Sequence, residues 1–311
     1  MALITAAGRE GMGEGRVRAR RRLGRRALAG YLFVSPAVLF LVVFALAPFL
    51  FTIYVSLHEW NMLTPVGEMP FRGLDNYRYL LFDDPTFRET FGNTFYYAVG
   101  NVGTSVVLAL GIALLLNGPV KLRPFWRAAF FMPYVTAQVA VAIVWRNMYN
   151  EGYGMLNGLL DMAGFAQQPF LDSLSQSMPS VIAVAVWHGI GYYMVIFLAG
   201  LQAIPGDLYE AARLDGANAW RLFWSITLPL LKPTLLFVIV VNTLSSLQVF
   251  DLPFVLTNGG PVNSTNTLVM YMYDTAFQFL RMGRATAMAV LLFGVIFVIT
   301  LVQLRLLRER E

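Results

Sequence analysis

Long apolar runs alternate with polar segments along the whole of this 311-residue chain. They cover residues 30–57, 91–116, 128–148, 180–204, 234–256 and 285–304. A helix of about 20 apolar residues crosses the hydrocarbon core of a bilayer, and each run is at least about that long. The pattern predicts an all-α integral membrane protein with six transmembrane helices. They would form one domain over residues 30–308, behind a basic arm of residues 1–29.

Basic residues between the runs indicate which loops face the cytoplasm, because lysine and arginine favour that side of short loops. Residues 121–127 hold three of them, whereas residues 149–179 hold none and segment 59–90 mixes both signs. Both termini are therefore expected in the cytoplasm, and the first run is expected to be an uncleaved signal anchor. The terminal clusters consist of Arg16, Arg18, Arg20, Arg21, Arg22, Arg25, Arg26, Arg305, Arg308 and Arg310. Arg281 and Arg284 are exceptions, since they lie on the expected outer side.

The amino-acid composition excludes several classes of protein and of binding site. Hydrophobic residues make up 57% of the chain and charged residues only 13%, which excludes an ordinary soluble domain. The net charge of +5 comes largely from the arginine cluster before the first run, so it does not indicate a nucleic-acid partner. Cysteine is absent, which excludes disulfides and thiolate metal sites. His58 and His188 are too few for a histidine-based metal centre, so no metal site is expected.

The polar segment between the fourth and fifth runs predicts two short helices joined by a bend. Asp207 can cap the first helix, and Glu210, three residues later, would complete a capping box. Gly216 can end that helix in a left-handed conformation. The second helix is expected to begin near Asn218 and to stack the rings of Trp220, Phe223 and Trp224. Proline lacks the backbone N–H, so Pro229 and Pro233 are expected to interrupt this second helix.

This segment resembles the EAA signature of permease subunits of binding-protein-dependent ABC importers. The residues that carry the resemblance are Glu210, Ala211, Ala212, Gly216, Ile226, Leu228 and Pro229. It implies the type I ABC importer permease fold, with a cytoplasmic loop, residues 205–233, that docks on a separate ATPase. The implied ATPase-coupling residues are Glu210, Ala211, Ala212, Asp215 and Gly216. The alternative is that Glu210 only caps a helix and Gly216 only ends it.

Four further motifs resemble the carbohydrate branch of these permeases, which serves maltose and glycerol-3-phosphate types of substrate. They are GLDNY at 73–77, DPTF at 84–87, NTFYY at 93–97 and TNGGP at 257–261. Amino-acid and metal importers also carry EAA loops, so these four motifs favour a sugar or a related compound as the substrate.

Polar side chains inside the fourth and fifth runs are candidates for lining a pathway, because such groups normally face a cavity or another helix. The fifth run supplies Asn242 and Ser246, four residues apart on one helical face, and Gln248. The resemblance to maltose-type permeases puts substrate contacts at Gly189, Tyr192, Asn242 and Ser246. The remaining candidates are His188 and Gln248, which lie beside them in sequence. The alternative is helix-to-helix hydrogen bonding, which contributes about 1 kcal/mol per bond.

The resulting prediction is a permease subunit in a bacterial inner or plasma membrane that imports a sugar or related compound. The implied partners are a second permease, two ATPase subunits that bind ATP and magnesium, and an extracytoplasmic solute-binding protein. The chain itself contains no Gly-x-x-x-x-Gly-Lys-Ser/Thr loop, so neither enzymatic ATP hydrolysis nor a cofactor is expected in it. An ion-coupled secondary transporter would require inverted repeats and paired intramembrane acids, which are not evident. An integral membrane enzyme would require a catalytic constellation, and none is evident.

Overall fold

The computed structural model describes residue 28 and residues 30–307. Within these residues the chain is helical apart from turns, loops and an isolated antiparallel bridge between His58 and Phe71. The predicted basic arm, its arginine cluster, Arg308 and Arg310 lie outside the described residues. The division into an arm of residues 1–29 and a domain of residues 30–308 therefore stays a prediction.

The described residues fall into two compact units that meet between Tyr54 and Val55. In the first unit the apolar run is helical from Gly30 and contains one π-helical turn, η1 (Val42–Leu46). The helix continues as α2 (Ala47–Ser56), so the first predicted span is a helix of the expected length.

The second unit consists of helices that differ widely in length. The long ones are α4 (Pro85–Asn117), α8 (Ser177–Gln202), α11 (Leu228–Leu247) and α14 (Met282–Leu307). Those of intermediate length are α5 (Arg123–Val135), α6 (Gln138–Met148), α7 (Met155–Met162) and α9 (Gly206–Leu214). The short ones are η2 (Val66–Glu68), α3 (Asp75–Arg78), η3 (Tyr79–Asp83), η4 (Phe170–Asp172), α10 (Ala219–Leu222), η5 (Phe223–Thr227), α12 (Asp251–Thr257), α13 (Leu268–Tyr273) and η6 (Asp274–Gln278).

Five described helices are long and apolar enough to cross a membrane, and the bent pair α5–α6 makes a sixth if it is counted as one span. The expectation of six spans is therefore confirmed with one change. The third run was predicted as a single helix, but α5 and α6 meet at an angle of 95°. Pro133 lies in the last turn of α5 and Thr136 is extended, so the helical hydrogen-bond ladder ends there.

The fifth run also differs from its prediction. Pro229 and Pro233 do not interrupt the helix, because α10, η5 and α11 form one apolar span from Ala219 to Leu247. The π-helical turn η5 comes directly before Pro229, where proline removes a hydrogen bond of the ladder. The predicted span also ends too late, since residues after Leu247 form a separate short helix, α12.

Helices α4 and α8 pack against each other in one of the buried clusters of the second unit, through small residues. Ala109 and Ala113 of α4 are fully buried against Phe197 and Leu198 of α8. Small side chains allow two helix backbones to approach closely, which drives packing where lipid tails are as apolar as leucine. The predicted motif DPTF begins α4, since the Asp84 carboxylate caps the helix by accepting from the Phe87 N–H.

The motif NTFYY contacts the segment that follows TNGGP at the same end of α4. The Asn93 amide donates to the carbonyl oxygens of Asn263 and Asn266 at 2.7 and 3.0 Å, and Thr94 accepts from the Leu268 N–H at 2.8 Å. NTFYY in α4 therefore holds the segment that follows TNGGP.

A second tie joins α13 to the start of α4. The Tyr271 hydroxyl donates to the buried Asp84 carboxylate at 2.7 Å. Burial, together with this hydrogen bond, raises the pKa of Tyr271, so the phenol stays protonated and remains a donor. The contact therefore keeps α13 fixed to the start of α4.

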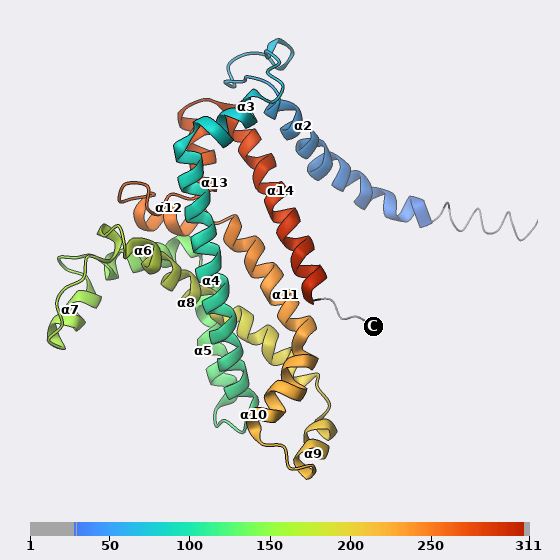
Figure 1. The fold of residues 1–311 in the computed structure, drawn as a ribbon, viewed down its shortest axis with the longest axis vertical. Coiled ribbons are helices and arrows are strands. Elements are labelled where there is room, and N and C mark those ends of the chain that lie inside the picture. Colours follow the sequence, from blue (N-terminus) through green and yellow to red (C-terminus); the bar gives the residue numbers. More distant parts are fainter. Residues whose placement is uncertain (1–27, 29, 308–311) are drawn as a thin grey trace, which may run out of the picture. The chain divides into compact units, whose positions relative to one another are not determined.

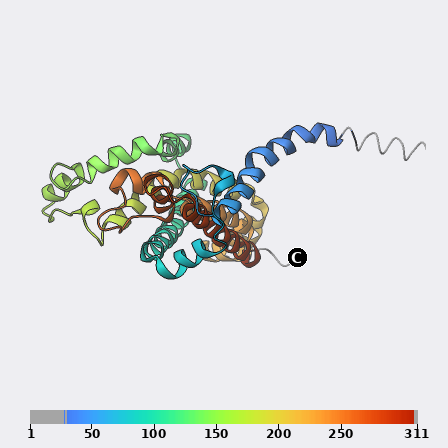
Figure 2. The ribbon, with the colours of Figure 1, turned by 90° about the horizontal axis from the view of Figure 1, so that it is seen from above.

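Within the second unit, the elements separate towards two ends. Figure 1 shows α9, α10 and the turn between α4 and α5 at one end, and α3 and α13 at the opposite end. Seen from above in Figure 2, the green segment from α5 to α7 extends to one side of the other helices. The predicted cytoplasmic loops thus share an end that lies opposite the predicted external segment 59–90.

Candidate functional site

The bend between α9 and α10 is the first part of the candidate site, and we call residues 205–227 the elbow. Gly216 follows α9 with a φ of +81°, as the sequence predicted, and the Ala217 N–H donates to the Ala212 carbonyl at 2.9 Å. The second helix begins beside Asn218 as predicted, and the structure adds that Asn218 caps α10 by accepting from the Arg221 N–H. The capping box is wrong: Pro205 occupies the N-cap, so Asp207 and Glu210 lie inside α9.

The elbow is rigidly braced and largely exposed. The Tyr209 hydroxyl of α9 lies 3.0 Å from the hydroxyl of Thr227, a buried residue in η5. Trp220 stacks edge-on against Trp224, which also contacts Phe223 in the predicted ring cluster. The hydrogen bond joins α9 to η5 across the bend, whereas the ring contacts lie within the helix formed by α10 and η5.

The coupling residues of the sequence prediction lie together on this elbow. Glu210, Ala211, Asp215 and Gly216 are exposed, and Ala212 is half-buried. Leu214 is 90% exposed and Trp220 is 71% exposed. Large apolar side chains exposed beside charged ones mark a surface that contacts another protein.

The second part of the candidate site is an aromatic group around α8. Its predicted members are His188, Gly189 and Tyr192, which the structure joins to Tyr134 of α5. The rings of Tyr134 and Tyr192 stack with centroids 4.5 Å apart and an interplanar angle of 15°. His188 Nε2 lies 3.2 Å from the Thr136 carbonyl, at the break between α5 and α6. Sequence reasoning missed Tyr134, because only the packing of α5 on α8 brings the two tyrosines together.

The third part is a buried polar network between α4 and α11. The Asn101 amide donates to Asn242 Oδ1 at 3.1 Å and to Ser246 Oγ at 2.9 Å. Ser105 donates to Asn101 Oδ1 at 3.2 Å, and Ser246 donates to Asn242 Oδ1 at 3.2 Å. Asn242 is fully buried, and its amide Nδ2 has no hydrogen-bond partner among the described residues.

The structure therefore divides the predicted substrate residues. Asn242 and Ser246 lie in the buried network, whereas His188, Gly189 and Tyr192 lie in the aromatic group. Gln248 ends α11 and is exposed. Within the described residues, no recorded hydrogen bond or ring contact joins the network to the aromatic group. Asn101 was also missed, although its signal was present as an isolated amide within an apolar run.

The part of the chain that the structure describes contains no cluster of three or more His, Cys, Asp or Glu side chains that could hold a metal ion. The candidate site is built instead from aromatic rings, hydroxyls, amides and an exposed elbow. Such groups can bind and guide an uncharged polar solute, since they provide donors, acceptors and ring faces.

Residues 105–310 match the protein family described as "Binding-protein-dependent transport system inner membrane component". The chain belongs to this family. The match includes α8, the elbow and α11, so the exposed elbow and the polar residues of α11 are parts of a permease.

Curated relatives resemble this permease over almost its entire length. The "Sulfoquinovosyl glycerol transport system permease protein" of Agrobacterium fabrum is 34% identical over 93% of each chain. The "Trehalose/maltose transport system permease protein" of Thermococcus litoralis is 35% identical over 92% of this chain and 96% of its own.

A solved structure also shares the fold of this permease. It is a bacterial ABC transporter involved in the import of the acidic polysaccharide alginate, with a TM-score of 0.80 and 23% identity. The match covers 94% of this chain and 98% of that chain, so the two proteins have the same arrangement of helices.

Proposed function

We propose that this chain forms, with a second permease subunit, the pathway by which an ABC importer takes up a sugar or a related compound. Two separate ATPase subunits, which bind ATP and magnesium, supply the work. An extracytoplasmic solute-binding protein delivers the substrate. The exposed elbow in a member of the binding-protein-dependent family carries this proposal, because it presents a braced surface for another protein. An ion-coupled mechanism is not favoured by membership of this family.

The elbow is the proposed ATPase contact. Glu210 and Asp215 provide exposed negative charge, Ala211 and Ala212 permit close approach, and Gly216 makes the bend. Because the elbow is held in one geometry, a movement of the ATPase would be transmitted to the helices on either side of the elbow, α8 and α11. The proposed topology places the elbow and both chain ends in the cytoplasm of a bacterial inner membrane.

Single cysteines are expected to report this topology, since the native chain has none. Cysteine at Asp83 or Asp161, which are both exposed, should react with a membrane-impermeant maleimide in intact cells. Cysteine at Arg123 or Arg213 should react only after the membrane is opened. Labelling of the Arg213→Cys variant in intact cells would contradict the six-span arrangement.

The proposed substrate is a sugar because the chain closely resembles permeases of sugar-type importers and carries an aromatic group in α8. Aromatic rings provide a flat face for a sugar ring, and uncharged donors and acceptors bind its hydroxyls. Tyr192 and Tyr134 would provide the ring faces, with Gly189 leaving space beside them. His188 and Gln248 would bind hydroxyls and affect which sugar is accepted. Asn242 and Ser246 would line the pathway once α4 and α11 separate.

Uptake measurements with two sets of variants test this assignment. Tyr192→Ala should reduce uptake about tenfold or more while the complex still assembles, and Tyr192→Phe should retain most uptake because the ring remains. One lost stacking contact of about 1.4 kcal/mol corresponds to a tenfold change. Normal uptake by a Tyr192→Ala, Asn242→Ala double variant would place the substrate contacts in the other permease subunit.

The Asn242→Ala variant separates packing from transport. Loss of the Asn242 side chain leaves the Asn101 amide without one of its two acceptors, so the thermal stability of the protein should decrease slightly. If Asn242 also contacts the sugar, the ratio of uptake rates for two different sugars will change. A purely structural residue would change stability and leave that ratio unaltered.

A further inference from the structure

A polar pocket lies at the end of the second unit opposite the elbow. Its volume is about 640 Å³, and it is formed by the loop of residues 59–72, by α3 and by the start of α14. Charged side chains of both signs line it: Glu59, Arg72, Asp75, Arg281 and Arg284. Arg281 and Arg284 are the two residues that depart from the preference of lysine and arginine for cytoplasmic segments.

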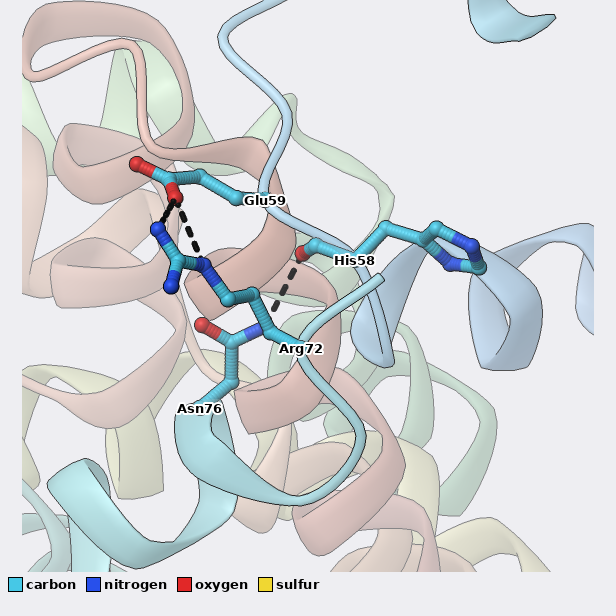
Figure 3. A network of polar contacts seen from close by, with 4 residues as sticks. All are labelled: His58, Glu59, Arg72 and Asn76. Atoms are coloured by element: carbon cyan, nitrogen blue, oxygen red, sulfur yellow. Dashed lines mark hydrogen bonds and ion pairs between the residues drawn. The ribbon is translucent and has the colours of Figure 1, made fainter. Parts of the chain in front are cut away.

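The wall of the pocket is a closed loop. The Arg72 N–H donates to the Leu57 carbonyl at 2.8 Å, and the Glu59 N–H donates to the Pro70 carbonyl at 2.9 Å. The Arg72 guanidinium donates twice to one Glu59 oxygen, at 2.9 and 2.7 Å. Figure 3 shows this ion pair above Asn76, whose buried amide donates to the Ser56 and His58 carbonyls. The loop is therefore held in one shape.

The start of α14 is fixed beneath the same loop. A Cβ on Gly283 would lie 2.1 Å from the His58 carbonyl oxygen, a distance that no side chain can adopt. Glycine at this position therefore allows α14 to approach the loop backbone closely. As a result, Arg281 and Arg284, one helical turn apart, line the pocket from a rigid base.

The pocket carries more positive than negative charge. The Arg72 and Glu59 charges neutralise each other, which leaves Arg281 and Arg284 against the single carboxylate of Asp75. Arg284 lies over the Tyr79 ring at 3.7 Å, and neither arginine pairs with a carboxylate of the described residues. The cation–π contact orients the Arg284 guanidinium without neutralising it. The pocket thus carries an excess of positive charge that is available to an anion.

We propose that this arginine pocket receives acidic side chains of the extracytoplasmic solute-binding protein. The inference rests on the proposed function, which requires such a partner on this face. The volume exceeds that of one carboxylate side chain and fits the tip of a loop. The lining presents two unpaired cations and one anion, so it complements a protein surface that carries charges of both signs better than an anionic lipid headgroup.

Association kinetics test the proposal. The probe is the purified solute-binding protein, and the receptor is the assembled transporter in nanodiscs. The Arg281→Gln, Arg284→Gln variant should lower the association rate constant about tenfold at low salt, because complementary charges mainly accelerate encounter. The Arg281→Glu, Arg284→Glu variant should lower it further, and Arg281→Lys, Arg284→Lys should retain most of it. The difference should shrink as salt shortens the range of the interaction.

Arg305→Gln is a control for charge removed elsewhere in α14, since Arg305 lies at the other end of the helix and its loss should leave association unchanged. Unchanged association in the Arg281→Gln, Arg284→Gln variant would overturn the inference. If association is unchanged and co-purified anionic phospholipid is lost, the inference is also overturned, because a lipid headgroup is then the occupant of the pocket. Failure of the proposed function would be seen separately, as a wild-type chain that does not assemble with ATPase subunits, and the inference would fail with it.

Discussion

Replacement of Gly191 by alanine is expected to prevent a stable transporter from forming. Gly191 lies in α8 where α5 crosses it, and a Cβ there would lie 1.8 Å from the Phe130 carbonyl oxygen. The next nearest atoms, at 2.5 and 2.8 Å, also belong to the α5 backbone, so no side-chain rotation can relieve the clash. Nonbonded carbon atoms need about 3.5–4.0 Å, so the two helices would have to separate.

The loss should be large because separation of the helices also removes the contact between Tyr134 and Tyr192. Overpacking commonly costs about 1–3 kcal/mol, and a backbone clash belongs at the upper end of that range or beyond. We expect a lower yield of assembled complex, a lower thermal midpoint in detergent and no measurable uptake. Gly111→Ala in α4 is the control, since nothing lies within 4 Å of its added carbon. Equal thermal midpoints for the two variants would show that α5 does not pack on α8 as described.

Gly216→Val should weaken the association of the ATPase subunits and lower uptake while leaving the membrane helices intact. The φ of +81° at this position excludes a β-branched residue at a cost of about 1–3 kcal/mol. Nothing lies within 4 Å of an added Cβ, so backbone strain would be the only local effect. The turn would then relax, and α9 would change its angle to α10. The measurements are co-purification of the ATPase subunits and sugar uptake, both expected to decrease about tenfold.

Gly216→Asn is the matched control, because asparagine adopts the left-handed region far more readily than valine. It should keep most of the ATPase and of the uptake. A Glu210→Ala variant should weaken association less than Gly216→Val, since it removes one exposed charge and leaves the bend in place. If Gly216→Val retains both the ATPase and full uptake, the coupling role proposed for the elbow is wrong.

The sequence predicted the number of spans and the elbow because both depend on local signals. Apolar length defines a span, and Gly216 followed by Asn218 defines a stop and a start within three residues. The sequence failed to predict whether a proline ends a helix, because that depends on the conformation of the neighbouring turn. A helix ends two residues after Pro133, yet the helix continues through Pro229 and Pro233 after a π-helical turn, and the presence of a proline alone does not separate these cases.

The candidate pathway was predictable only in part. Polar residues in α11 were evident, but their partner Asn101 lies 141 residues away from Asn242 in the chain, and helical periodicity gives no information about such distant contacts. The stacked pair of Tyr134 and Tyr192 likewise depends on the packing of α5 on α8. The arginine pocket was visible in the sequence only as a violation of the charge rule. Its loop, its ion pair and the close approach at Gly283 required the three-dimensional structure.

The tie between Asn93 and the segment after TNGGP has a consequence for biosynthesis. Asn93 and Asn263 are separated by 170 residues, which take about 10–30 s to synthesise at bacterial rates. During that interval α4 is already made, while the backbone carbonyls that accept from Asn93 have not yet left the ribosome. The Asn93 amide therefore lacks these acceptors until Asn263 and Asn266 emerge. A ribosome stalled before residue 263 would hold a chain whose early helices are made but whose Asn93 end of α4 is still without this contact.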